Sequence, residues 1–495
     1  IKLNICKNSL SYFFQLSYIP APLTIFENVY KLEKGNILEL NLDEFELKNF
    51  NITHNSNDYN IKFKSKDFKI KKFDEIFSQV IEDHLISDVS NGTLLSGGID
   101  STIITHYANK VSNNKISSYC VKSIDDTFDE SVYAEKIAKK IGTNHTTLDF
   151  SKDEFFDILK NIHKVYDEPF GDSSQIPTYL LFKSVKNKIK VALSGDGGDE
   201  IFLGYNRYLY LNNYYNKIKY LNKNVRKIIK IFLDSFSENQ INKIGNLLNI
   251  NYSYLGNKFS KVSNSLNFEN IEEFYFQIIR QDCNYENIVK NINILKSSFL
   301  NNLAFDKNLN NLENFQQIDL NTYLSDDIFV KVDRASMFNS VESRAPFVDN
   351  RVMDFAKQLD LSDKINSKKT KLFLRNILDN EFDKADFERP KMGFGNPIGK
   401  FLNSELKDWV QCPHYHKKSW VEKVSSFEGN EYTAFGSSIH SLCENAIQGL
   451  LDSSEYDDFF DDDYTPKQIG QIIDNAAFLN LDGEDVSLSN FDGTY

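Results

Sequence analysis

The amino-acid sequence predicts an α/β protein built on a doubly wound parallel sheet. Short apolar runs alternate with segments of helical periodicity between residues 72 and 193, which is the pattern of parallel strands joined by helices. Two of the apolar runs end in glycine turns followed by further helical segments. The length of 495 residues, with 41% hydrophobic and 26% charged residues, indicates a globular protein of two to four domains.

Each element follows from its own pattern. Residues 1–60 predict strands and turns, and the Lys-rich stretch 61–72 predicts a linker. Phe73, Phe77 and Val80 share one helical face, so a helix is expected over 72–86. The other expected elements are strands at 24–30, 37–42, 93–95, 116–121 and 189–193, helices at 130–141, at 153–166 and from Ser101 onward, and helices with polar loops over 210–320.

The first glycine turn follows an apolar strand and reads SGGIDS over residues 96–101. A turn of this kind directs backbone N–H groups and a helix N-terminus toward one point, which favours an anion such as a phosphate. Ser96 and Ser101 add hydroxyl donors, whereas Asp100 would repel a phosphate unless Mg²⁺ lay between them. A plain strand-to-helix turn is the alternative, and the motif lacks the lysine of a P-loop.

The second glycine turn, SGDGGDE over residues 194–200, also follows an apolar strand. Asp196, Asp199 and Glu200 place three carboxylates within five residues, which suits a metal or a general base. Ligands of parallel sheets bind at the carboxyl ends of the strands, so both turns are expected to face one crevice. A solvated acidic loop is the alternative.

These motifs resemble those of asparagine synthetases. The resemblance continues in DEPFGDSSQIPTY at 167–179, in YLSDDIFVKVDRASMFNSVESRAPFVD at 323–349 and in ERPKMGFGNPIGKFL at 388–402. It covers residues 70–410, with the motifs in the family's order. It implies an ATP pyrophosphatase fold and the cofactors ATP and Mg²⁺. The implied reaction adenylates the aspartate side-chain carboxylate, releases pyrophosphate and forms an amide with ammonia.

The resemblance also implies roles for individual residues. Leu94 and Val121 would hold the adenine and ribose, and Ser194 and Gly195 would contact the nucleotide through their main chain. Ser96, Gly97, Gly98, Asp100 and Ser101 would bind the pyrophosphate with Mg²⁺, which Asp199 would help to hold. Asp196 would deprotonate ammonia, and Lys391 would neutralise the leaving pyrophosphate. Surface or ion-pair positions are the alternative for Lys391 and Arg344.

Both ends of the chain depart from the family pattern. Residues 1–60 resemble only the last part of a glutaminase domain, and Cys6 lacks the surroundings of a glutaminase nucleophile, so an incidental thiol is expected. The sequence begins at Ile1 rather than methionine, which indicates a missing start. Residues 411–495 resemble the opening of a RecB-type PD-(D/E)XK nuclease, but the later carboxylate–lysine core is not found and His440 is expected to pack in a helix.

Composition limits the remaining functional classes. No apolar stretch approaches the roughly 20 residues of a membrane span, and no signal peptide is recognised, so a cytoplasmic protein is expected. Five cysteines without a CxxC pair suggest neither disulfides nor zinc, and a net charge of −13 disfavours nucleic acid. Three hypotheses stay open: an amide synthetase, with a separate glutaminase or a second copy as a possible partner; a DNA-processing nuclease; and a non-catalytic remnant.

Overall fold

The computed structural model describes residues 3–43, 46–52, 63, 65–123, 129–236, 240–241, 255–280 and 306–388. The chain forms two compact units. The first combines Ile1–Asn213 with Asn293–Asn396, and the second combines Tyr214–Ile292 with Pro397–Tyr495. The first unit holds both glycine turns, and it therefore contains the candidate site.

The first unit is organised around a parallel sheet in the order β5-β4-β3-β6-β7. Its strands are β3 (Asn91–Leu94), β4 (Ser117–Val121), β5 (Asn144–Leu148), β6 (Val191–Leu193) and β7 (Glu342–Arg344). Along the chain the sheet grows from β3 toward β5, and then restarts with β6 on the other side of β3. The direction of winding thus reverses between β3 and β6, and such a switch point is where open parallel sheets bind ligands.

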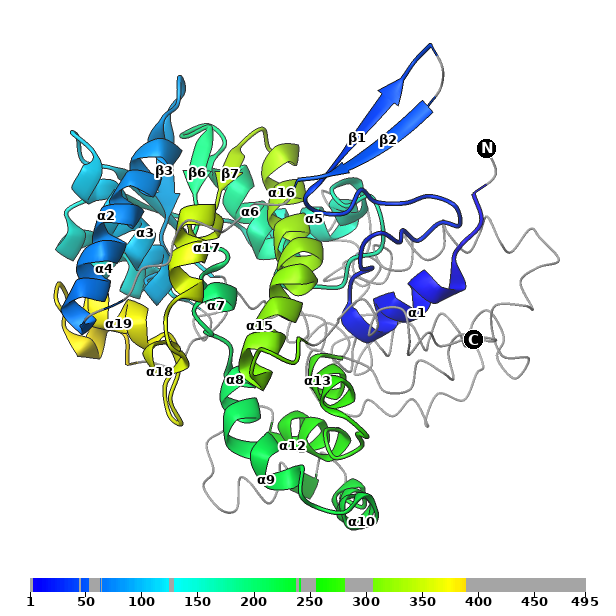
Figure 1. The fold of residues 1–495 in the computed structure, drawn as a ribbon. Helices are drawn as coiled ribbons and strands as arrows, with labels where there is room; N and C mark the ends of the chain where they lie inside the picture. The colour runs from blue at the N-terminus through cyan, green and yellow to red at the C-terminus, as the bar shows by residue number, and fades with distance from the viewer. Residues whose placement is uncertain are drawn as a thin grey trace, which may run out of the picture. The chain divides into compact units, whose positions relative to one another are not determined.

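Helices cover both faces of this sheet, as the prediction of a doubly wound α/β fold requires (Figure 1). Val191 and Leu193 of β6 join a core with helices α2, α3, α4, α17 and α19. Ala192, whose side chain points the other way, joins a second core with α6 and α16. The alternation follows from the period of two in a strand, since successive side chains point to opposite faces.

The elements expected for the sheet and its helices are confirmed, with shifted ends. The helices of the first unit are α1 (Lys7–Leu16), α2 (Lys66–Leu85), α3 (Ile99–Val111), α4 (Ser131–Ile141), α5 (Lys152–Asn161), α6 (Gln175–Val185), α7 (Gly198–Ile201), α8 (Asn206–Tyr210), α15 (Asn311–Asn321), α16 (Phe329–Phe338), α17 (Asn350–Lys357), α18 (Leu361–Lys364) and α19 (Leu372–Leu378). The predicted linker 61–72 was wrong from Lys66 onward. Ser65 caps α2 by accepting a hydrogen bond from the Phe68 N–H, so the helix begins earlier than its apolar face suggested.

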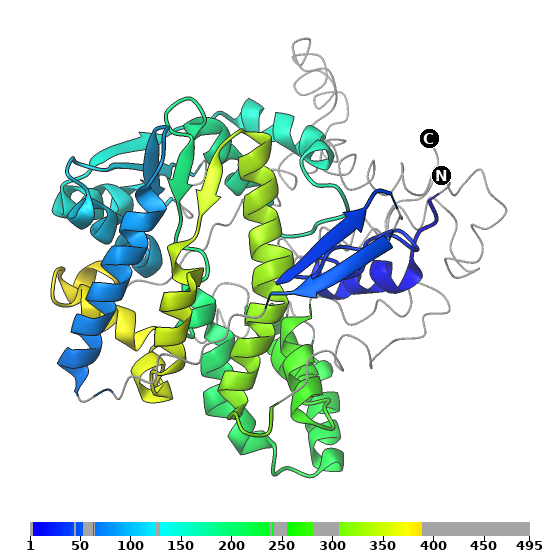
Figure 2. The ribbon, with the colours of Figure 1, turned by 45° about the horizontal axis from the view of Figure 1, so that its top comes forward.

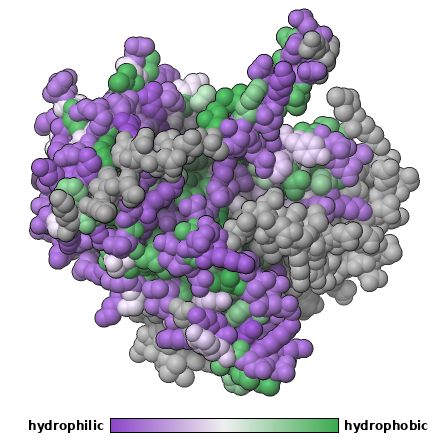
Figure 3. Space-filling view, viewed as in Figure 1, coloured by the Kyte–Doolittle hydropathy of each residue, from purple (hydrophilic) through white to green (hydrophobic). Residues whose placement is uncertain are grey.

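The N-terminal segment differs most from its prediction. Residues 7–16 form helix α1, and 24–30 make only isolated bridges instead of a strand. The expected strand at 37–42 is β1 (Asn36–Asn41), paired antiparallel with β2 (Glu46–Asn51). Apolar side chains on both strands are about half exposed, and Figure 3 shows hydrophobic atoms mixed with hydrophilic ones on this hairpin.

A long helical segment leads into the last strand of the sheet. Helix α15 continues through a π-helical turn, Leu324–Ile328, into α16, and Figure 2 shows the three as a nearly continuous helix beside β7. Isolated π-turns often accompany functional sites, because the extra residue re-aims the side chains around it. Ser325 in this turn and Phe329 directly after it line a pocket described below.

The described residues of the second unit are mainly helical, as the sequence predicted for this region. Its helices are α9 (Asn216–Ile218), α10 (Lys223–Asp234), α12 (Leu255–Asn264) and α13 (Ile271–Ile279). The Arg226 guanidinium lies 3.6 Å from the centre of the Phe268 ring, a cation–π contact that joins α10 to the segment before α13. The C-terminal stretch 411–495, including the nuclease-like motif and His440, lies outside the described residues.

Candidate active site

The first glycine turn is organised by its own serines. Ser96 and Ser101 hydroxyls lie 3.0 Å apart, and the Ser96 N–H donates to Ser101 Oγ over 3.2 Å. Gly97 has a φ of +73°, and a Cβ there would lie 2.9 Å from the backbone nitrogen of Ala134 at the start of α4. A side chain at position 97 would therefore be strained and would collide with backbone. The turn needs glycine for its shape.

The two glycine turns meet, as the sequence predicted. A Cβ on Gly195 would lie 2.9 Å from both the Cβ of Asp100 and the backbone nitrogen of Ser101. The turn after β6 is anchored to β7, because the Ser194 N–H donates to the carbonyl of Arg344 over 2.8 Å. Adjacent parallel strands thus bring residues nearly one hundred positions apart in the chain into one crevice.

A buried lysine lies between the carboxylates of the two turns. The Lys371 Nζ forms ion pairs with Asp100 from the first turn and with Asp199 Oδ1, at 2.5 Å, from the second. Both carboxylates are largely buried. In the described part of the chain, no group of three or more His, Cys, Asp or Glu side chains could hold a metal ion.

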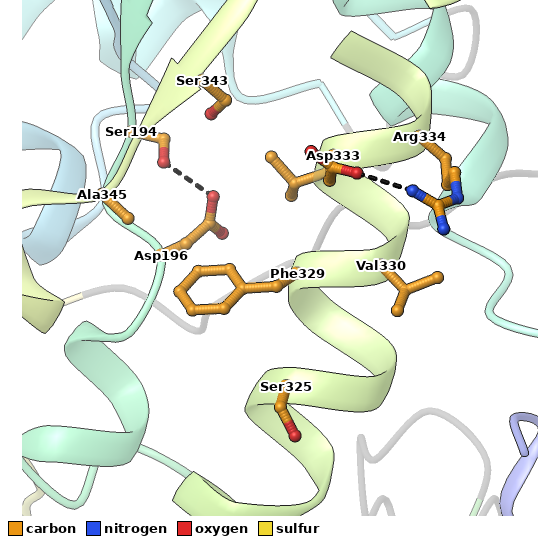
Figure 4. A pocket seen from close by; sticks show the side chains of 10 residues that line it. Ser194, Asp196, Ser325, Phe329, Val330, Asp333, Arg334, Ser343 and Ala345 are labelled. Atoms are coloured by element: carbon orange, nitrogen blue, oxygen red, sulfur yellow. Dashed lines mark hydrogen bonds and ion pairs between the residues drawn. The ribbon is translucent and has the colours of Figure 1, made fainter. Parts of the chain in front are cut away.

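A pocket of about 420 Å³ opens beside the second turn (Figure 4). Ser194 and Asp196 lie on one wall, where the Ser194 hydroxyl donates to Asp196 Oδ2 over 2.7 Å. Asp333 and Arg334 of α16 lie on the opposite wall. The complete lining is Ser194, Asp196, Ser325, Phe329, Val330, Val332, Asp333, Arg334, Ser343 and Ala345. A pocket with charges of both signs and several apolar side chains suits a small zwitterion.

An ion pair is buried behind the pocket, on the other side of α16. Lys331 Nζ lies 2.6 Å from Asp172 Oδ2 and 2.8 Å from Ser174 Oγ. Burial raises the pKa of Asp172, but the Lys331 ammonium and hydrogen bonds from Ser174 outweigh it and lower the pKa to about 2. The charge on Lys331 also acts on Asp196. The pair therefore fixes the position of an ammonium group that interacts with the pocket carboxylate.

The remaining predicted residues are Leu94, Val121, Arg344 and Lys391. Leu94 and Val121 end the neighbouring strands β3 and β4, on the side where the glycine turns lie. Arg344 pairs with Glu342 and donates to the carbonyls of His84 and Ile86, which favours the ion-pair alternative for this residue. Lys391 lies outside the described residues.

Sequence patterns did not single out five charged residues of this region: Asp172, Lys331, Asp333, Arg334 and Lys371. The first four lie inside motifs that carried the family resemblance, but a motif does not show which of its side chains turn toward a site. Lys371 lies outside those motifs, and no local signal pointed to it.

The fold and the two turns define a doubly wound α/β protein whose two glycine turns meet at the switch point of its parallel sheet. The sequence matches the model of the asparagine synthase family over residues 72–421, and the chain belongs to that family. Its fold is accordingly of the ATP pyrophosphatase-like type.

Individual relatives agree with this assignment. Glutamine-hydrolysing asparagine synthetase 1 of Bacillus subtilis is 26% identical over 413 residues, which cover 83% of this chain and 62% of the relative. A provisionally named asparagine synthetase of Mycobacterium tuberculosis is 30% identical over 413 residues, covering 81% of this chain and 60% of the relative. The chain thus spans about three-fifths of the length of these relatives. None of the helices in its described part combines the length and apolar character needed to cross a bilayer.

Proposed function

We propose that this protein is an ATP-dependent carbon–nitrogen ligase that converts aspartate to asparagine. The observation that carries the proposal is the meeting of the two glycine turns at the switch point, with the pocket of Asp196 directly beside them. This arrangement offers one subsite for the phosphates of a nucleotide and a second for an amino-acid acceptor. The family membership supports the same reaction.

The first turn would bind the pyrophosphate portion of ATP. Backbone N–H groups at the start of α3 and the hydroxyls of Ser96 and Ser101 are suited to phosphate oxygens. Asp100 and Asp199 would hold Mg²⁺, which usually takes one or two protein carboxylates and completes its shell with phosphates and water. Two carboxylates facing the same ammonium fit that requirement. The bound ion would neutralise charge on the leaving pyrophosphate.

The pocket would bind the acceptor. Arg334 and Asp333 line the pocket; Arg334 would pair with the α-carboxylate of an amino acid, and Asp333 with its ammonium group. The side-chain carboxylate would then point toward the glycine turns. One of its oxygens attacks the α-phosphorus of ATP, the bond to pyrophosphate breaks, and an acyl-adenylate forms. Positioning of the two substrates supplies much of the rate acceleration.

Asp196 would act in the second half of the reaction. Ammonia attacks the acyl carbon, a proton passes from nitrogen to Asp196, and AMP leaves as the amide forms. The Ser194 hydroxyl donates to this carboxylate, and the Lys331 ammonium lies close enough to interact with its charge. A proton acceptor must be in its ionised form. Lys391, from the ERPKMGFG stretch, would add a charge at the leaving pyrophosphate.

The test is to incubate the protein with ATP, Mg²⁺, aspartate and ammonium, and to measure pyrophosphate, AMP and asparagine together. We expect the three products in equal amounts, and no pyrophosphate when aspartate is omitted. Asp100→Ala should abolish pyrophosphate release, whereas Asp74→Ala, which removes a surface ion pair with Lys110, should retain it. Absence of aspartate-dependent pyrophosphate from the wild type would leave the non-catalytic remnant as the better hypothesis.

A further inference from the structure

Lys371 is held in an unusual position. It precedes α19 with a φ of +54°, a left-handed conformation that residues other than glycine seldom adopt. Only 4% of the residue is exposed. A strained backbone persists where the surrounding structure over-determines it, and this is common at functional sites. The strain and burial indicate that the ammonium is held at one place.

The Lys371 ammonium lies between two separate loops. Asp100 belongs to the turn after β3 and Asp199 to the turn after β6, and Lys371 contacts both. The chain also leaves room for the lysine: a Cβ at Gly204 would lie 2.1 Å from Lys371 Cε and 2.0 Å from Asp199 Oδ1. The lysine thus links the two halves of the site, since each half carries one of its partners.

A divalent cation and this ammonium would compete for the same oxygens. Mg²⁺ needs carboxylate oxygens at about 2.0–2.1 Å, and two cations on one pair of carboxylates repel each other strongly where burial limits screening. Free Mg²⁺ alone would have to displace the lysine. The phosphates of a nucleotide bring extra ligands and negative charge, which shift the balance toward the divalent ion.

We propose that Lys371 is an internal counter-ion that holds Asp100 and Asp199 together until a divalent cation arrives with the nucleotide. The lysine acts as a positioning residue: it keeps the two turns assembled and makes cation entry dependent on nucleotide. This inference rests on the proposed nucleotide site, but its test does not require turnover.

The experiment is thermal unfolding of the full chain with Mg²⁺ alone, with Mg²⁺ and ATP, and with NaCl of matched ionic strength. For the wild type we expect no rise in the unfolding midpoint with Mg²⁺ alone, and a rise with Mg²⁺ and ATP. Lys371→Met should lower the midpoint. In this variant Mg²⁺ alone should raise the midpoint by several degrees, because the two carboxylates no longer pair with the lysine and can bind the ion. Lys371→Arg keeps the positive charge, so Mg²⁺ alone should not raise its midpoint.

Lys69→Met is the matched control, because Lys69 also bridges two carboxylates, those of Asp360 and Asp363, away from the glycine turns. Its midpoint should show no specific response to Mg²⁺. An equal response in Lys69→Met, or none in Lys371→Met, would overturn the proposal. If Lys371→Met does not fold, Mg²⁺ binding to the wild type is measured by calorimetric titration instead. Tight binding of Mg²⁺ without nucleotide would contradict the proposal. A wild type that ATP fails to stabilise would instead count against the proposed function.

Discussion

At the scale of single residues, neighbouring acids near the site differ in pKa because their surroundings differ. Glu200 is 1% exposed and accepts a hydrogen bond from the Tyr205 hydroxyl over 2.5 Å. Burial, and then the charge of Asp199, raise the pKa of Glu200 to about 7. Asp172 is also largely buried, but Lys331 holds its pKa at about 2. A buried acid near a cation stays ionised, whereas one near another acid holds its proton.

This difference predicts a pH dependence for Glu200→Gln. The pKa of Glu200 rises from 4.5 to about 7 on folding, so the native state binds more protons than the unfolded state between these values. Stability therefore falls as pH rises through this window, by up to about 3 kcal/mol. Glutamine carries no charge and avoids the loss. We expect Glu200→Gln to unfold at a higher temperature than the wild type at about pH 8, and to show a smaller difference at about pH 5.

The measurement is the unfolding midpoint of both proteins across that range of pH. A difference that stays constant with pH would show that Glu200 is ionised in the native protein throughout, and would contradict the prediction.

A second residue-scale prediction concerns Lys391. Loss of one preorganised positive donor to a leaving group typically costs 10² to 10³ in rate, or about 3–4 kcal/mol. We expect Lys391→Ala to lower kcat and kcat/KM for pyrophosphate release by this order, with ATP binding less affected. Lys391→Arg should restore activity only partly, because a planar guanidinium does not replace a compact ammonium.

Lys384→Ala provides the control, because Lys384 is an exposed lysine a few residues earlier in the chain and pairs only loosely, at 3.6 Å, with Asp379. Wild-type kcat in Lys391→Ala would remove this residue from the site.

At the scale of elements, the phosphate loop depends on how closely α4 packs against it. Gly97 lies against the backbone at the first turn of α4, and both belong to the same compact unit. An alanine there must adopt a left-handed conformation, at about 1–2 kcal/mol, and must also push α4 away. We expect Gly97→Ala to lower the unfolding midpoint and to weaken ATP binding, measured by the ATP-induced shift of that midpoint.

A substitution at Gly142 distinguishes the backbone strain from the collision with α4. It caps the other end of α4 with a φ of +87°, but a Cβ there would meet nothing within 4 Å. Gly142→Ala therefore carries the backbone strain without the collision. We expect a smaller loss of stability and unchanged ATP binding. Equal effects in the two variants would show that the contact with α4 does not shape the loop.

At the scale of the whole molecule, the nitrogen donor is the property to test. Cys6 lies at the start of α1, where its N–H donates to the carbonyl of Ile25 over 2.8 Å, and its thiol is partly buried. This thiol lies inside a folded segment. We expect a polypeptide of these 495 residues to make asparagine with ammonium chloride and to release no glutamate from glutamine. Glutamate release in a coupled assay would contradict this prediction.

The fold class was predictable because its signals are local. Apolar residues precede both glycine turns, Leu94 and Leu95 at the end of β3 and Val191–Leu193 in β6, and helix α2 shows its apolar face directly in the sequence. The N-terminal segment was misassigned for the opposite reason. Residues 24–30 have the apolar and β-branched composition of a strand, but within the part of the chain that the structure describes they form only isolated bridges, with Ile5 and Leu23. Composition indicates which secondary structure a segment favours, but the formation of a strand also depends on the segments next to it in space.

The sequence by itself determined the α/β class, the two glycine turns and their place at the ends of strands of one sheet, because strand and helix periods and glycine turns are properties of consecutive residues. Only the tertiary structure decided that Lys371 lies between Asp100 and Asp199, that Lys331 pairs with Asp172, and that α16 forms a wall of the Asp196 pocket. Lys371 and Asp100 are 271 positions apart. Contacts across such separations depend on how whole elements pack, and no pattern of neighbouring residues encodes them.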